Sequence, residues 1–228
     1  GKNVIEILFD SPVVRSKALE EKHGSLGVAL EPHRVYVRKA QYSFGWDWGP
    51  RLTTSGIWRD IYLEAWSGVR VRNAYVRVVS IKRYQAVIQV EVELDREPKR
   101  GLSLHVAVMG EGKMIEMSAA VRAKTVSCSL RIPNPKLWWP NGYGEQPLYL
   151  AVLSLRDGGT ELEKKTVTFA IRMVRLLQEK DREGKSFIFE INGKRIYCKG
   201  ADWIPSGNFI PSIPDSTYEQ LLRMAKDA

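Results

Sequence analysis

Aromatic and charged residues crowd into one short segment of the chain, Tyr42 to Arg51. Its sequence is Tyr-Ser-Phe-Gly-Trp-Asp-Trp-Gly-Pro-Arg, so four aromatic side chains, one acid and one base share ten positions. Aromatic faces pack on the apolar C–H face of a sugar ring, and a carboxylate accepts hydrogen bonds from sugar hydroxyls. Trp46 and Asp47 therefore predict carbohydrate recognition. The structural alternative is equally open: the aromatic residues plug the end of a β-sandwich, and Asp47 pairs only with Arg51.

Two further segments combine aromatic residues with turn formers. Residues 137–144 read Leu-Trp-Trp-Pro-Asn-Gly-Tyr-Gly, which we interpret as structural, with Trp138 or Trp139 anchoring a loop against a neighbouring domain. Residues 199–205 read Lys-Gly-Ala-Asp-Trp-Ile-Pro and follow a predicted strand. In a βα barrel the carboxyl ends of the strands face the active site. From the residues alone, a turn with a packing Trp at Asp202 and Trp203 is favoured over a place at an active site.

No other pattern in the sequence predicts catalytic chemistry. The three histidines have no metal-ligand spacing, and Cys128 and Cys198 lie too far apart for a zinc or redox motif. We therefore predict no metal and no cofactor. A retaining glycosidase needs two carboxylates about 5 to 5.5 Å apart, and nothing marks such a pair. We expect no catalytic residue in this chain.

Most of the sequence alternates apolar and polar residues in short runs between Gly, Pro and Asn, which predicts an all-β texture. The run from Val69 to Arg172 holds six or seven such segments, as expected of an immunoglobulin-like sandwich. The predicted strands are 4–9, 34–40, 57–65, 69–79, 85–94, 102–109, 126–132, 148–155 and 166–172.

The pattern changes after Val174. Asn192-Gly193 is a two-residue turn sequence, and its flanks 187–190 and 195–199 predict a hairpin. Ser216 with Glu219 predicts a capping box at the start of a helix. Its apolar stripe needs a covering surface, so we expect the first unit of an α/β domain. The stripe consists of Tyr218, Leu221, Leu222 and Ala225.

Composition favours a globular protein. The 228 residues are 44% hydrophobic and 27% charged, and the formal charge of +9 is dispersed among acids, so we predict no nucleic-acid partner. No apolar run is long enough to span a membrane. The sequence has no Asn-X-Ser/Thr acceptor, which favours a cytoplasmic location. It begins with Gly rather than Met, so we expect its natural beginning to be missing.

The segment Arg38 to Arg51, followed by Ser-Gly-Ile-Trp-Arg at 55–59, resembles the β-mannosidase branch of glycoside hydrolase family two. Residues 137–149 resemble a segment of the family's first immunoglobulin-like domain, and residues 192–205 resemble the start of its catalytic barrel. The three motifs stand in the family's order across nearly the whole chain.

The resemblance implies a mainly β internal fragment of such an enzyme. Residues 1–66 would be the end of a jelly-roll sugar-binding domain, 67–174 an immunoglobulin-like sandwich, and 175–228 a hairpin linker with the first βα unit of a truncated (β/α)8 barrel. The family's Trp-Asp pair maps onto Trp46 and Asp47, and the barrel's first strand makes Asp202 and Trp203 further substrate-binding candidates.

The resemblance also implies an activity. We expect the full enzyme to hydrolyse terminal non-reducing β-D-mannose with retention, acting on a β-mannoside or manno-oligosaccharide. Both catalytic glutamates would lie on later barrel strands, so this fragment would be inactive, and the missing parts of its own chain would pack against it. Two alternatives stay open: a non-catalytic carbohydrate-binding module, and a β-galactosidase or β-glucuronidase relative.

Overall fold

The computed structural model describes residues 3–227, and these divide into two units. One unit is built from the described parts of 1–64 and 201–228, and the other from 65–200. Among the described residues no helix is long and apolar enough to cross a membrane. The prediction of a mainly β chain is confirmed, since strands contain more of the described residues than helices do.

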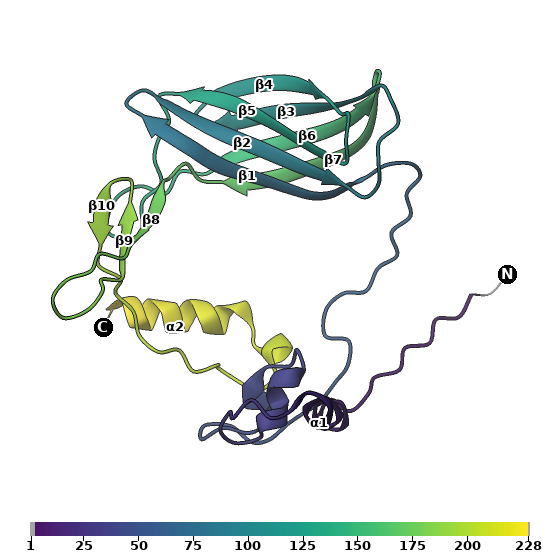
Figure 1. The fold of residues 1–228 in the computed structure, drawn as a ribbon, viewed down its shortest axis with the longest axis vertical. Coiled ribbons are helices and arrows are strands. Elements are labelled where there is room, and N and C mark those ends of the chain that lie inside the picture. The colour runs from purple at the N-terminus through teal and green to yellow at the C-terminus, as the bar shows by residue number, and fades with distance from the viewer. Residues whose placement is uncertain (1–2, 228) are drawn as a thin grey trace. The chain divides into compact units, whose positions relative to one another are not determined.

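The unit 65–200 is dominated by seven strands in two antiparallel sheets (Figure 1). The order β1-β2-β5 joins β1 (Val71–Lys82), β2 (Gln85–Leu94) and β5 (Thr125–Pro133). The order β4-β3-β6-β7 joins β3 (Leu102–Gly110), β4 (Lys113–Ala120), β6 (Tyr149–Asp157) and β7 (Thr160–Phe169). Pairing of β4 with β3 differs from the constant-type immunoglobulin order, in which the fourth strand joins the other sheet. The sequence did not predict β4.

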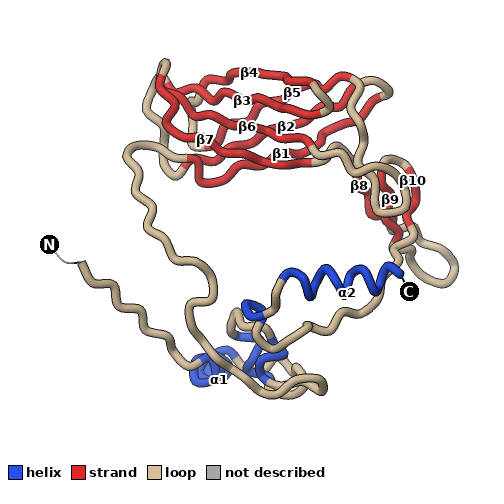
Figure 2. Tube along the Cα trace, turned by 180° about the vertical axis from the view of Figure 1, so that it is seen from behind, coloured by secondary structure: helices blue, strands red, loops and turns tan. Residues whose placement is uncertain are grey.

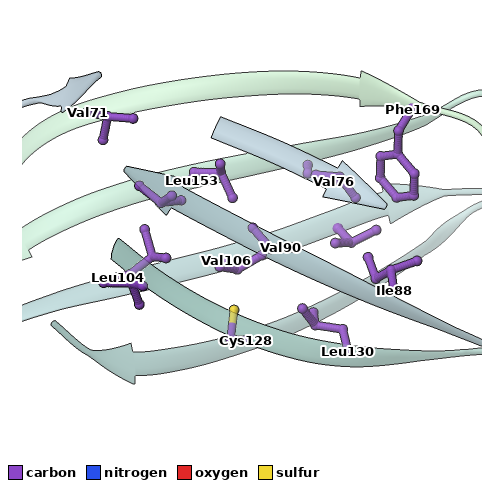
Figure 3. Packing of buried hydrophobic residues seen from close by; sticks show 14 of the residues in the cluster. Val71, Val76, Ile88, Val90, Leu104, Val106, Cys128, Leu130, Leu153 and Phe169 are labelled. Carbon is purple, nitrogen blue, oxygen red and sulfur yellow. The ribbon is translucent and has the colours of Figure 1, made fainter. Parts of the chain in front are cut away.

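Alternation along the strands builds the core between the two sheets. Every second residue of β2 and β5 is buried, which places Ile88 and Val90 in the same hydrophobic cluster as Leu104 and Leu153 of the other sheet (Figure 3). Burial of such side chains stabilises the fold by about 1.5–3 kcal/mol each. Cys128 lies in this core, as expected of a small hydrophobic residue, and burial raises the pKa of its thiol.

A third sheet follows the sandwich in the order β10-β9-β8. Asn192 and Gly193, between β9 and β10, have φ of 51° and 82°. Two consecutive positive φ angles define the turn that Asn-Gly predicts, so the predicted hairpin is confirmed. The strands are β8 (Val174–Leu177), β9 (Ile188–Ile191) and β10 (Lys194–Ile196).

The other unit contains helices and irregular segments. Helix α1 (Pro12–His23) is capped by Ser11, whose hydroxyl accepts the Val14 N–H, and it ends at Gly24 with φ of 87°. These Ser-Pro and Gly signals are in the sequence, but the helix was not predicted. The remaining helices are the short turns η1 (Pro32–Tyr36), η2 (Gln41–Phe44) and η3 (Ile210–Ser212), and helix α2 (Asp215–Asp227).

The predicted strands of the partial jelly roll, 4–9, 34–40 and 57–65, were wrong. Within 3–64 the structure has no strand longer than an isolated bridge, and tan tube runs through 3–11 and 53–68 (Figure 2). A strand forms only when neighbours satisfy its N–H and C=O groups, and none of the described segments pairs with these three. Leu8 and Leu63 are consequently 89% exposed.

The predicted first βα unit of a barrel is not formed either. Residues 197–209 contain no strand among the described residues, because β10 ends at Ile196 in the hairpin sheet. Helix α2 begins at Asp215, so Ser216 lies in its first turn rather than at the N-cap. None of the described residues of α2 is buried, and Leu222 of the predicted stripe is 60% exposed.

Replacing Gly110 with Ala is expected to destabilise the sandwich. A Cβ at this position would overlap the buried ring of Tyr149, whose hydroxyl accepts the Lys136 N–H at 2.9 Å. Overpacking of this kind costs about 1–3 kcal/mol. Urea unfolding should show the loss, and Gly159→Ala should not, because no atom lies within 4 Å of its Cβ position. Equal stability of the two variants would contradict the packing described for Tyr149.

Asp95 is expected to make the unfolding of this unit pH-dependent. The Arg70 N–H donates to its Oδ1 at 3.0 Å, and this bond, followed by Arg96, lowers the pKa of Asp95 to about 2. Because the folded pKa lies below the ordinary value, the stabilisation is present above pH 4 and is lost as pH falls from about 4 to about 2. Thermal unfolding of Asp95→Asn should therefore vary less across that window than unfolding of the parent; an identical acid limb would contradict this role.

Candidate functional site

Backbone hydrogen bonds fold the aromatic segment into a tight turn. Trp46 and Gly49 exchange N–H···O bonds of 3.1 and 3.4 Å, so Asp47 and Trp48 form the tip. Gly45 enters the turn with φ of 105°, a conformation that favours glycine. The Leu52 N–H donates to the Ser43 carbonyl at 2.9 Å and closes the base of the loop. Trp46 and Asp47 are thus presented side by side on an ordered turn.

The aromatic residues of this loop have different surroundings. Phe44 is buried, with its ring edge-on to His33 at 5.7 Å. Trp48 packs at 5.2 Å from Tyr42. Trp46 is 45% exposed, and the Arg34 guanidinium lies 5.1 Å from its ring centroid. Trp46 is therefore the ring best placed to contact a ligand.

Asp47 has an exposed carboxylate at the tip of the turn. No hydrogen bond or ion pair joins its side chain to another of the described residues. Arg51 instead pairs with Glu31, with Nη2 3.0 Å from Oε2 and a second, shorter bond from Nε to Oε1. The structural alternative, a pair between Asp47 and Arg51, was therefore wrong. The Asp47 carboxylate is exposed and has no partner among the described residues.

A buried polar network lies beneath the loop. The Ser16 hydroxyl is 2.8 Å from Nδ1 of His33, and Nε2 of His33 is 3.0 Å from Glu31. Hydrogen bonding from Arg51, with a smaller contribution from His33, lowers the pKa of Glu31. A hydroxyl, an imidazole and a carboxylate in series are the parts of a nucleophilic relay, but Ser16 is fully buried and cannot reach a substrate. The network supports the loop through the contact of His33 with Phe44 and the bonds of Glu31 with Arg51.

The structure does not bring Asp202 and Trp203 to the Trp46–Asp47 turn. Both are exposed in the irregular segment 197–209, and no ring contact or polar bond joins them to the turn among the described residues. The same segment does reach the loop at Asn208, where a Cβ on Gly49 would lie 2.7 Å from Oδ1. No sequence signal marked Asn208.

A groove of about 590 Å³ runs beside the loop. Tyr42, Ser43, Trp58 and Asn208 line part of it, whereas Trp46 and Asp47 do not. The candidate site is therefore an exposed turn rather than a closed pocket. An enzyme that encloses a terminal sugar needs further walls, which the described residues do not supply.

The second aromatic cluster, 137–144, is structural. The backbone N–H of Trp138 donates to the Ile171 carbonyl at 2.9 Å, and the Trp138 carbonyl accepts from the Asn192 side-chain amide at 3.0 Å. The Tyr143 hydroxyl accepts the backbone N–H of Tyr197 at 3.1 Å. It links the sandwich to the hairpin sheet.

Two family models match the chain. One, described as a glycosyl hydrolase 2 galactose-binding domain-like region, covers residues 1–59, and the other, glycosyl hydrolases family 2, covers residues 69–172. The chain therefore belongs to glycosyl hydrolase family 2.

Within that family the chain is similar to β-mannosidases. Beta-mannosidase B of Neosartorya fischeri is 37% identical over 98% of this chain, which spans 27% of that relative's length. The crystal structure of the β-D-mannosidase of Dictyoglomus thermophilum matches with a TM-score of 0.76 and 38% identity, over 92% of this chain and 27% of its own. An exo-chitosanase of Amycolatopsis orientalis, at a TM-score of 0.53 and 23% identity over 68% of this chain and 18% of its own, shares the fold alone.

Proposed function

We propose that the longer protein containing this chain is a retaining exo-β-mannosidase that removes terminal, non-reducing β-D-mannose residues. The observation that carries the proposal is the Trp46–Asp47 turn, with a half-exposed indole beside an unpaired carboxylate. Similarity to β-mannosidases over nearly the whole chain supports mannose as the sugar.

The residues of this chain would bind the sugar rather than cleave the glycosidic bond. Trp46 would pack on the ring face and Asp47 would accept hydrogen bonds from its hydroxyls, while Asp202 and Trp203 would add contacts once the barrel strand beside them is formed. Two glutamates outside this chain would act as nucleophile and as general acid and base. The chain alone would be inactive, and no cofactor is needed.

The remaining parts of the protein would complete the surfaces that this chain leaves uncovered. In this proposal residues 1–66 belong to the jelly-roll sugar-binding domain, 67–174 to the immunoglobulin-like domain, and 175–228 to the linker and barrel start. The exposed apolar residues of 57–65 and α2 support it, because surfaces of this kind mark packing sites.

Replacing Trp46 or Asp47 with Ala in the longer protein is expected to reduce kcat/KM for 4-nitrophenyl β-mannoside by roughly 10- to 100-fold, the usual cost of losing a charged hydrogen bond or a stacked ring. The thermal midpoint of the Asp47 variant should be unchanged, since that side chain is exposed and unpaired, whereas the Trp46 variant should unfold at a lower temperature, since its ring lies beside the buried Arg34 guanidinium. Glu116→Ala, which removes an exposed carboxylate of β4, is the control. Parent-like kinetics in both variants would remove the sugar-contact role.

A substrate panel separates this proposal from its alternatives. Faster turnover of a β-galactoside or β-glucuronide than of a β-mannoside would identify a relative of the same fold that is specific for another sugar. Mannoside binding without turnover by the longer protein would identify a binding module.

A further inference from the structure

Arg34 is a buried cation with two unpaired guanidinium nitrogens. It is 3% exposed, and its Nε and Nη1 have no hydrogen-bond partner among the described residues. A buried charge is costly unless something compensates it. Among the described residues, the Trp46 ring is the group that faces this charge, with its centroid 5.1 Å from the guanidinium carbon.

We propose that Arg34 is a positioning residue for substrate binding, which holds the Trp46 indole through a cation–π interaction. This proposal rests on the sugar-binding function proposed above for Trp46. The guanidinium lies over the indole, and the part of the ring that stays exposed is left to the sugar. Without the cation, Trp46 would keep its place in the turn but lose the orientation of its ring.

Both partners of this contact are held by independent bonds. Arg34 lies in η1, where its N–H donates to the Glu31 carbonyl at 3.1 Å, and its neighbour His33 is held by Ser16 and Glu31. Trp46 is fixed by its two backbone bonds to Gly49. The contact therefore joins two ordered backbone segments, as a pre-organised binding group requires.

A double-mutant cycle in the longer protein tests this role, using R34M, W46A and the double variant. R34M removes the charge and keeps an unbranched side chain that can fill most of the buried space. We expect R34M to reduce kcat/KM for 4-nitrophenyl β-mannoside roughly tenfold, and to have little further effect in the W46A background. R34K should retain more activity than R34M, and R72M, which removes an exposed arginine of β1, should behave as the parent.

Each other result has a defined meaning. Parent-like kinetics of R34M, or the same fold-loss with and without Trp46, would overturn the positioning role and leave the sugar-contact role intact. Parent-like kinetics of W46A would overturn both. If R34M fails to fold, as thermal unfolding would show, the same cycle with R34K decides: additive losses overturn the proposal, and a loss that vanishes in W46A supports it.

Discussion

Pairing of backbone groups between strands is the constraint on which this structure depends. In the unit 65–200 every strand from β1 to β7 has a neighbour, so alternating apolar residues meet in a single core. Residues 57–65 are also rich in β-branched, aromatic and aliphatic side chains, but no described segment pairs with them, and they stay irregular and exposed. Residue type thus marks which segments can form a strand, and a neighbour decides whether they do.

The Trp46–Asp47 turn has a defined backbone conformation although no sheet surrounds it within residues 3–227. Its order comes from short-range bonds within 31–52: the Trp46–Gly49 bridge, the Glu31–Arg51 pair and the Arg34 contact. Because Arg51 forms its ion pair with Glu31, it does not pair with the Asp47 carboxylate. The ion pair therefore matters to the site mainly by leaving the neighbouring acid unpaired, since exposed pairs themselves stabilise little.

The sandwich strands and the Asn-Gly hairpin could be predicted because periodicity and turn chemistry are local properties of the sequence. The pair Trp46 and Asp47 could be selected from residue type and from the family resemblance. Strand β4, rich in Met and Ala, has weaker β-propensity and was missed. The contacts of Arg51 with Glu31, of Arg34 with Trp46 and of Asn208 with Gly49 could not be predicted. Each depends on the tertiary fold, which residue spacing does not encode.

In the proposed function, this chain supplies sugar contacts to an enzyme whose catalytic carboxylates lie elsewhere in the longer protein. The most direct measurement is hydrolysis of a chromogenic β-mannoside by this purified chain, beside the same assay on the protein produced from the extended reading frame. We expect turnover by the longer protein alone. Turnover by this chain would contradict the proposed function, because the catalytic carboxylates would then lie within these 228 residues.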